Sequence, residues 1–115
     1  MATFPKTREQ LLDESMFVYV GPVTDVREQE VPAGDGTNVL FEADMDVEEV
    51  EKALLGAGEE RPTLHYWRAG KREPGWSGDT GQHSPLQPGT RIRAFVTYDA
   101  EGKAQLLDPN GWEPA

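Results

Sequence analysis

The side chains with the greatest chemical potential lie between Arg61 and Arg93. This segment holds six of the eleven Lys and Arg residues, both histidines and two of the three tryptophans, against the two acids Glu73 and Asp79. Its formal charge is +4 (6 − 2), whereas residues 1–60 carry −11 (4 − 15) and residues 94–115 carry −3 (1 − 4). Aromatic rings beside arginine make good contacts for stacked rings, sugars or protein partners. The segment predicts a basic-aromatic binding face, whose contact residues are His65, Trp67, Arg68, Arg72, Trp76, Arg91, Arg93 and Phe95.

One triplet in this segment has the form of a catalytic motif. Asp79-Thr80-Gly81 matches the short signature of aspartic proteases, in which two such aspartates share a proton and activate water. A single copy would require a homodimer, and the triplet in that family follows an apolar strand, whereas Trp76-Ser77-Gly78 precedes it here. The stretch Gly75–Asp79 also lacks the spacing of a serine nucleophile elbow. A solvated Gly-rich turn is the better interpretation, and we predict no catalytic residue.

Metal-binding side chains are present, but they lack the spacing of a metal site. His65 and His83 could join Asp79 on zinc, yet no helical or hairpin spacing links the two histidines. Acidic side chains that alternate along one expected strand could attract calcium; they are Glu42, Asp44, Asp46 and Glu48. The D-x-D-x-D-G loop of calcium sites is missing there, so a solvated strand face explains them better. We predict no metal ion and no cofactor.

Composition narrows the classes of function. The chain has no cysteine, which excludes a disulfide framework, a thiolate zinc site and a cysteine nucleophile. The net charge of −10 repels phosphate backbones at long range and disfavours nucleic acid as a partner. The sequence has no run of 18 apolar residues and no signal-peptide pattern at its start, so we expect no membrane insertion. Cytoplasmic and exported locations, the latter with a removed leader, stay open, as does the oligomeric state.

The elements that must position these side chains are mostly strands in a single domain, 1–115. Residues 1–7 are expected to be flexible, and a capping box at Thr7 and Gln10 predicts a helix over residues 8–15. Runs of β-branched, aromatic and alternating residues predict strands at 17–26, with a break at Gly21-Pro22, and at 39–47, 63–67, 91–98 and 103–107. Asp35-Gly36 predicts a hairpin turn. Beyond Val47 the pattern fits either a short helix or a strand that continues to about Val50, and residues 69–89 form a long Gly/Pro-rich loop.

This order of elements fits a mainly β fold, a five- to six-stranded antiparallel OB-like barrel with a short N-terminal helix. It resembles the small bacterial barrels built like the netrin and tissue-inhibitor-of-metalloproteinase modules. The resemblance rests on an apolar strand that ends at Gly21, a charged strand that ends near Gly56, and Leu86-Gln87-Pro88-Gly89 before the apolar strand at 91–98. The chain lacks cysteines, including the N-terminal one that reaches zinc in the inhibitors. The resemblance therefore implies no metalloproteinase inhibition and no site residue.

Placed on these strands, the basic-aromatic segment divides into a platform and a flap. His65 and Trp67 on one strand would lie beside Arg91, Arg93 and Phe95 on another if the two strands pair. The loop would carry Arg72, Trp76 and His83 over that platform. The competing interpretation is that the aromatic rings complete the core while the arginines neutralise the acidic strand.

The sequence therefore predicts a non-catalytic binding or interaction module that uses a basic-aromatic face. Its expected partner is a protein or an anionic or carbohydrate ligand. The alternative is a hydrolase, either a homodimer like an aspartic protease or a metal-dependent enzyme around His65, His83 and Asp79. Binding of single-stranded nucleic acid is a third possibility, because the local charge of +4 opposes the overall charge of −10.

Overall fold

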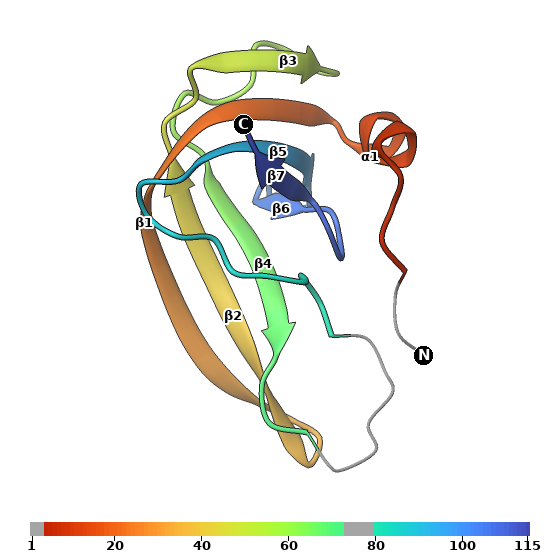
Figure 1. Ribbon diagram of the computed structural model, residues 1–115, viewed down its shortest axis with the longest axis vertical. Coiled ribbons are helices and arrows are strands. Elements are labelled where there is room, and N and C mark those ends of the chain that lie inside the picture. The colour runs from red at the N-terminus through yellow and green to blue at the C-terminus, as the bar shows by residue number, and fades with distance from the viewer. Residues whose placement is uncertain (1–3, 73–79) are drawn as a thin grey trace.

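The computed structural model describes residues 4–72 and 80–115, which form one short helix and seven strands (Figure 1). The elements are α1 (Arg8–Glu14), β1 (Phe17–Ala33), β2 (Gly36–Met45), β3 (Glu49–Ala53), β4 (Thr63–Ala69), β5 (Arg91–Tyr98), β6 (Ala104–Leu106) and β7 (Trp112–Pro114). Trp76, a predicted contact residue, and Asp79, the aspartate of the Asp-Thr-Gly triplet, lie outside the described residues.

Five strands close into a barrel in the order β1-β2-β4-β6-β5, and β5 pairs back onto β1. This arrangement confirms the mainly β, OB-like barrel with an N-terminal helix. One detail of the prediction is wrong, because β4 and β6 run parallel. Five strands cannot alternate in direction all the way around a closed ring, so at least one neighbouring pair must be parallel.

The remaining two strands extend strands that the barrel already contains. β3 pairs with the first half of β1, beyond the region where β2 pairs with the second half. β7 pairs with the first half of β5, while β6 pairs with the second half. The structure has seven strands rather than the predicted five or six because two lines of the sheet are interrupted. β2 and β3 pair with successive parts of β1, and β6 and β7 pair with successive parts of β5.

Local sequence signals explain most of the elements. Thr7 and Gln10 form the capping box that starts α1. The hairpin turn between β1 and β2 is present, although Ala33 pairs with Gly36, so its central residues are Gly34 and Asp35 rather than the predicted Asp-Gly. The positive φ of 60° at Gly34 suits a two-residue hairpin.

The segment after Val47 forms strand β3, so the helical alternative is wrong. Val50 faces Tyr19 across the β1–β3 ladder, and the register shifts by one residue between Val18 and Tyr19. Backbone pairing with β1 therefore overrides the helical spacing of Val47, Val50 and Leu54. In the preceding strand, the predicted alternation is confirmed, because Phe41, Ala43 and Met45 are all buried.

The barrel interior holds the main core, and α1 covers a second, smaller one. The main core is lined by the inward side chains of the strands; it contains Phe17, Tyr19, Val23, Phe41, Ala43, Met45, Leu64, Tyr66, Ile92, Ala94, Val96, Ala104 and Leu106, with Leu86 from the long loop. The smaller core packs Leu11 of α1 against Val18 and Phe95 on the outside of β1 and β5. Phe95 is 0% exposed, so its prediction as a contact residue is wrong: the helix covers the face on which it lies.

The described end of the predicted loop is tied into the body of the protein. Leu86 enters the core, and its backbone N–H donates to the Tyr66 hydroxyl at 2.9 Å. Gln82 is buried; its amide group donates to Leu107 O and Asp108 Oδ1, and its carbonyl accepts from Gly111 N–H. Residues 80–86 therefore join β4 to the C-terminal segment.

Among the described residues, no helix is long and apolar enough to cross a membrane.

Candidate functional site

One partly exposed apolar surface of the barrel lies on the outer side of β2 and β4. Leu40 faces Trp67 across the ladder, and Glu42 faces His65 one step along it. Because the inward positions of these strands hold Phe41, Leu64 and Tyr66, the four intervening side chains point outward. Leu40 is 45% exposed, and Trp67 is partly exposed. We refer to Leu40, Glu42, His65 and Trp67 as the β2–β4 face.

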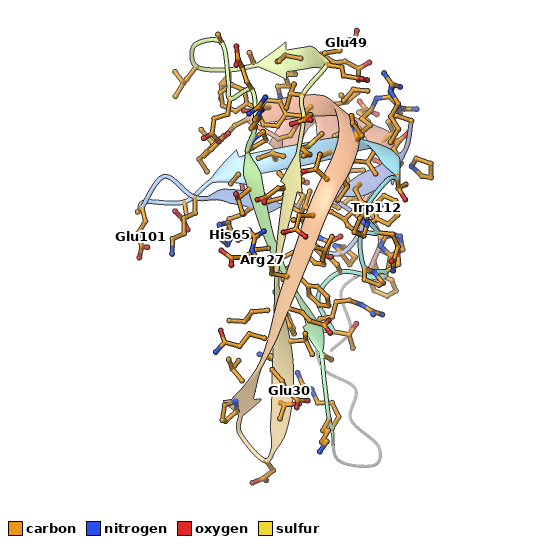
Figure 2. The ribbon with its side chains drawn as sticks, turned by 90° about the vertical axis from the view of Figure 1, so that its left-hand side faces the viewer. Arg27, Glu30, Glu49, His65, Glu101 and Trp112 are labelled. Atoms are coloured by element: carbon orange, nitrogen blue, oxygen red, sulfur yellow. The ribbon has the colours of Figure 1, made fainter. Side chains whose placement is uncertain are left out.

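Two adjoining hollows make this face concave. One, of about 570 Å³, runs toward β1, and the other, of about 480 Å³, runs toward the β5–β6 turn; both include Leu40, His65 and Lys103. Figure 2 shows His65 and Arg27 close together on this side, with Glu101 on the projecting turn beside them. Volumes of this size fall within the range of small-ligand sites.

A network of side-chain bonds along β1 and β2 holds Arg27, which lies on β1 beside the β2–β4 face. Its guanidinium donates to Asp44 at 2.8 and 3.1 Å and to Asp25 at 2.8 Å, and lies 3.8 Å from Glu42. The hydrogen bonds that Asp44 accepts from Arg27, with a further one from the Thr63 hydroxyl, lower the pKa of Asp44. The charge of Arg27 is thus already matched within the protein.

The opposite rim of the face is the β5–β6 turn, which is held by Asp99. The Asp99 carboxylate accepts from the backbone N–H groups of Glu101 and Lys103 and from the Gln105 side chain. These bonds, led by the one from Lys103, lower the pKa of Asp99. Lys103 lies 3.4 Å from Glu101. The turn therefore presents a fixed rim of polar side chains to the hollow.

Acids outnumber bases around the two hollows. The charged residues that line them are Arg27, Glu28, Glu42, Asp99, Glu101 and Lys103. Four carboxylates against two cations give a formal charge of −2 when His65 is neutral. His65 Nδ1 lies 3.8 Å from Glu42 Oε2. This surface is aromatic as predicted, but it is weakly acidic rather than basic.

The loop after residue 80 positions Trp67. The indole N–H donates to Asp108 at 3.2 Å, and Gly81 pairs with Arg68 beside β4. A Cβ atom at Gly81 would lie 2.2 Å from the Trp67 carbonyl oxygen and 2.9 Å from the indole ring. Because Gly81 also has a φ of +73°, the close approach of loop and tryptophan requires glycine there.

The predicted arginines bind partners elsewhere in the protein. Arg68 donates to the carbonyls of Gln82 and His83, and Arg72 donates to the Thr37 carbonyl and the Asn38 side chain. Arg91 pairs with Glu48 at 2.9 Å, and Arg93 pairs with Glu51 and with Glu113. In the described residues, β4 pairs with β2 and β6 but not with β5, so the predicted platform does not assemble. The competing interpretation, pairing of arginines with acids, is the one observed for Arg91 and Arg93.

His65 and His83, the two described residues of the metal-dependent hydrolase alternative, have different surroundings. His83 Nδ1 lies 2.7 Å from the Pro109 carbonyl oxygen, and its ring lies against Trp112. His65 lies on the β2–β4 face, where Glu42 is its nearest charged partner. Within residues 4–72 and 80–115, no three His, Cys, Asp or Glu side chains are grouped as metal ligands would be.

Sequence reasoning missed Leu40, Lys103 of the β5–β6 turn and Gln105 of β6. Leu40 carried a usable signal, because a large apolar residue occupies an outward position of a strand whose next two outward positions are the acids Glu42 and Asp44. Lys103 and Gln105 carried no such signal, because only the barrel closure brings β6 beside β4.

Comparison of the chain with protein-family models, curated proteins and solved structures gave no match. The resemblance to the netrin and metalloproteinase-inhibitor modules therefore stays a prediction, and the site must be judged on its own geometry.

Proposed function

We propose that this protein is a non-catalytic binding module whose ligand lies across the β2–β4 face. The observation that supports this most directly is the Leu40–Trp67 pair, two outward apolar side chains that face each other in the middle of a concave surface. Exposed apolar groups within a polar rim are typical of binding sites. OB-type barrels bind their ligands on the corresponding strands and adjoining loops.

The chemistry of the face favours an uncharged carbohydrate chain among the expected ligands. Trp67 and Leu40 offer a surface for the apolar face of a sugar ring. Asn38, Gln29, Gln105 and the carboxylates around them offer hydrogen-bond groups for hydroxyls. The formal charge of −2 around the hollows, within a protein of charge −10, disfavours anionic ligands, including single-stranded nucleic acid.

The proposal is tested by titrating ¹⁵N-labelled protein with uncharged oligosaccharides of six units and, separately, with a dT oligonucleotide. The indole N–H resonance of Trp67, assigned by its loss in Trp67→Phe, reports on the face directly. We expect this resonance and the amides of residues 38–42 and 65–67 to shift with a carbohydrate and not with the oligonucleotide.

A pair of matched variants distinguishes specific binding at this face from non-specific binding to any exposed leucine. Leu40→Ser should weaken carbohydrate binding by about tenfold or more, equivalent to about 1.4 kcal/mol. Leu12→Ser removes a leucine of similar exposure, 43% against 45%, from α1 and should leave the affinity unchanged. Equal loss in both variants, or shifts confined to residues outside the face, would contradict the proposal.

A further inference from the structure

The second surface that stands out is β3 with the residues just before it and the connection after it, which we call the β3 surface (residues 46–60). It contains six acids, Asp46, Glu48, Glu49, Glu51, Glu59 and Glu60, and one base, Lys52, for a formal charge of −5. Within this acidic stretch, Leu54 and Leu55 are 60% and 68% exposed, and Val50 on the strand is also exposed. Large exposed apolar residues inside a charged rim mark interaction surfaces more often than chance exposure does.

The β3 strand is open on one side. It stands at the end of the strand order and, among the described strands, pairs only with β1. Figure 1 shows it at the top of the molecule, at the opposite end from the β1–β2 hairpin tip. An open strand edge offers backbone N–H and C=O groups to an added strand.

The exposure of the leucines is built into the fold rather than due to a loose loop. At one end of the connection, the Leu54 N–H donates to the Met16 carbonyl at 2.9 Å. At the other end, Glu59 N–H donates to the Tyr19 hydroxyl, and the Glu59 carboxylate accepts from the Tyr98 hydroxyl at 2.7 Å. Gly58 lies so close to Tyr19 that an added Cβ would be 2.8 Å from its ring. Both ends are thus fixed to β1 and to the barrel core.

The charges of this surface distinguish between possible occupants. Glu48 and Glu51 are matched by Arg91 and Arg93, whereas Glu49 and Glu60 are exposed and have no ion pair within the described residues. A second copy of the chain would bring the same −5 surface and a net charge of −10 to the interface. A partner with basic side chains would instead find the unmatched carboxylates of Glu49 and Glu60 near the start of β3, where the Glu60 carbonyl accepts from the Val47 N–H at 2.8 Å.

We infer that the β3 surface docks an extended polypeptide segment that carries alternating basic and apolar side chains and adds to β3 as a further strand. Backbone hydrogen bonds to the open edge of β3 supply affinity, Leu54 and Leu55 receive the apolar side chains, and Glu49 and Glu60 pair with the basic ones. This surface is separate from the β2–β4 face, so the inference does not depend on the carbohydrate proposal.

The test uses a capped seven-residue peptide, Lys-Leu-Lys-Val-Lys-Leu-Lys, and two matched peptides. In one the lysines are replaced by glutamates, and in the other the central valine is replaced by proline, which removes a backbone donor. We expect the basic peptide to shift the amide resonances of residues 49–55 and to slow their hydrogen exchange. The proline peptide should bind about tenfold more weakly, and the glutamate peptide should not bind.

Two charge-reversal variants distinguish a site from general attraction to an acidic protein. Glu49→Lys should weaken the peptide by about fivefold or more at low salt, whereas Asp35→Lys, the same change at the exposed hairpin tip, should weaken it by less than about twofold. Equal effects of the two variants, equal binding of the proline peptide, or shifts that map to the β2–β4 face would overturn the inference. Concentration-dependent shifts of residues 49–55 without any peptide would overturn it in favour of a second copy.

Discussion

The outer faces of β4 and β5 look alike in sequence and differ in structure. Each strand alternates buried residues with a mixture of aromatic and basic residues, His65 and Trp67 on β4 and Arg93 and Phe95 on β5. On β5, α1 covers Phe95, and Glu51 and Glu113 bind Arg93. On β4 the corresponding side chains border open hollows. The same composition thus produces packing on one strand and an accessible surface on the other, because different elements lie outside each strand.

The largest expected effect sharpens this contrast by truncating one aromatic residue on each strand. Phe95→Ala should destabilise the protein by about 3–5 kcal/mol, because it leaves a cavity between α1, β1 and β5. Trp67→Ala removes a half-covered ring and one hydrogen bond, so its cost should be smaller, about 1–2 kcal/mol. Urea denaturation of both variants measures the difference. Equal costs would mean that the β4 face is part of the core as well.

An intermediate effect concerns the loop that holds Trp67 in place. Gly81→Ala should cost about 2 kcal/mol or more, since it combines a left-handed backbone with a collision against the Trp67 carbonyl. Gly89→Ala is the matched control, because its φ is +88° but an added Cβ meets nothing within 4 Å. We expect that control to cost only about 1 kcal/mol. If thermal unfolding finds the two variants equally stable, then Gly81 does not constrain the face.

The smallest expected effect compares the ion pairs of the two regions through pH. Arg27 lowers the pKa of Asp44 beside the β2–β4 face, and Arg93 lowers the pKa of Glu51 beside β5. A carboxyl whose pKa is lower when folded stabilises the protein above its ordinary pKa, and this contribution is lost as the pH falls through the folded value. Both groups are partly exposed, so each contribution should be about 1 kcal/mol or less.

Asp44→Asn and Glu51→Gln should therefore be less stable than the parent at pH 7, and the difference should shrink below about pH 4. Denaturation midpoints measured between pH 7 and pH 2.5 give both curves. A difference that stays constant over this range would show that lost packing, and not the charge pair, causes the destabilisation.

Much of the fold follows from local pattern. The capping box gives α1 its start, the alternation from Val39 to Met45 gives β2 its buried side, and Leu64 and Tyr66 face inward as their spacing predicts. These features depend on residues close together in the chain, which is why they can be predicted. The residues of the β2–β4 face, the proposed site, could be predicted only in part, since His65 and Trp67 were among the predicted contacts but Leu40 and Glu42 were not.

The sequence by itself determined which side of each strand is buried and that the chain closes into a small barrel. Only the tertiary structure decided which outward side chains reach solvent. Phe95 is hidden by a helix more than eighty positions earlier in the chain, Arg91 and Arg93 meet acids more than forty positions away on one side, and Leu40 stays open. Burial on the outside of a strand depends on what packs over it, and elements far apart in the chain supply that cover.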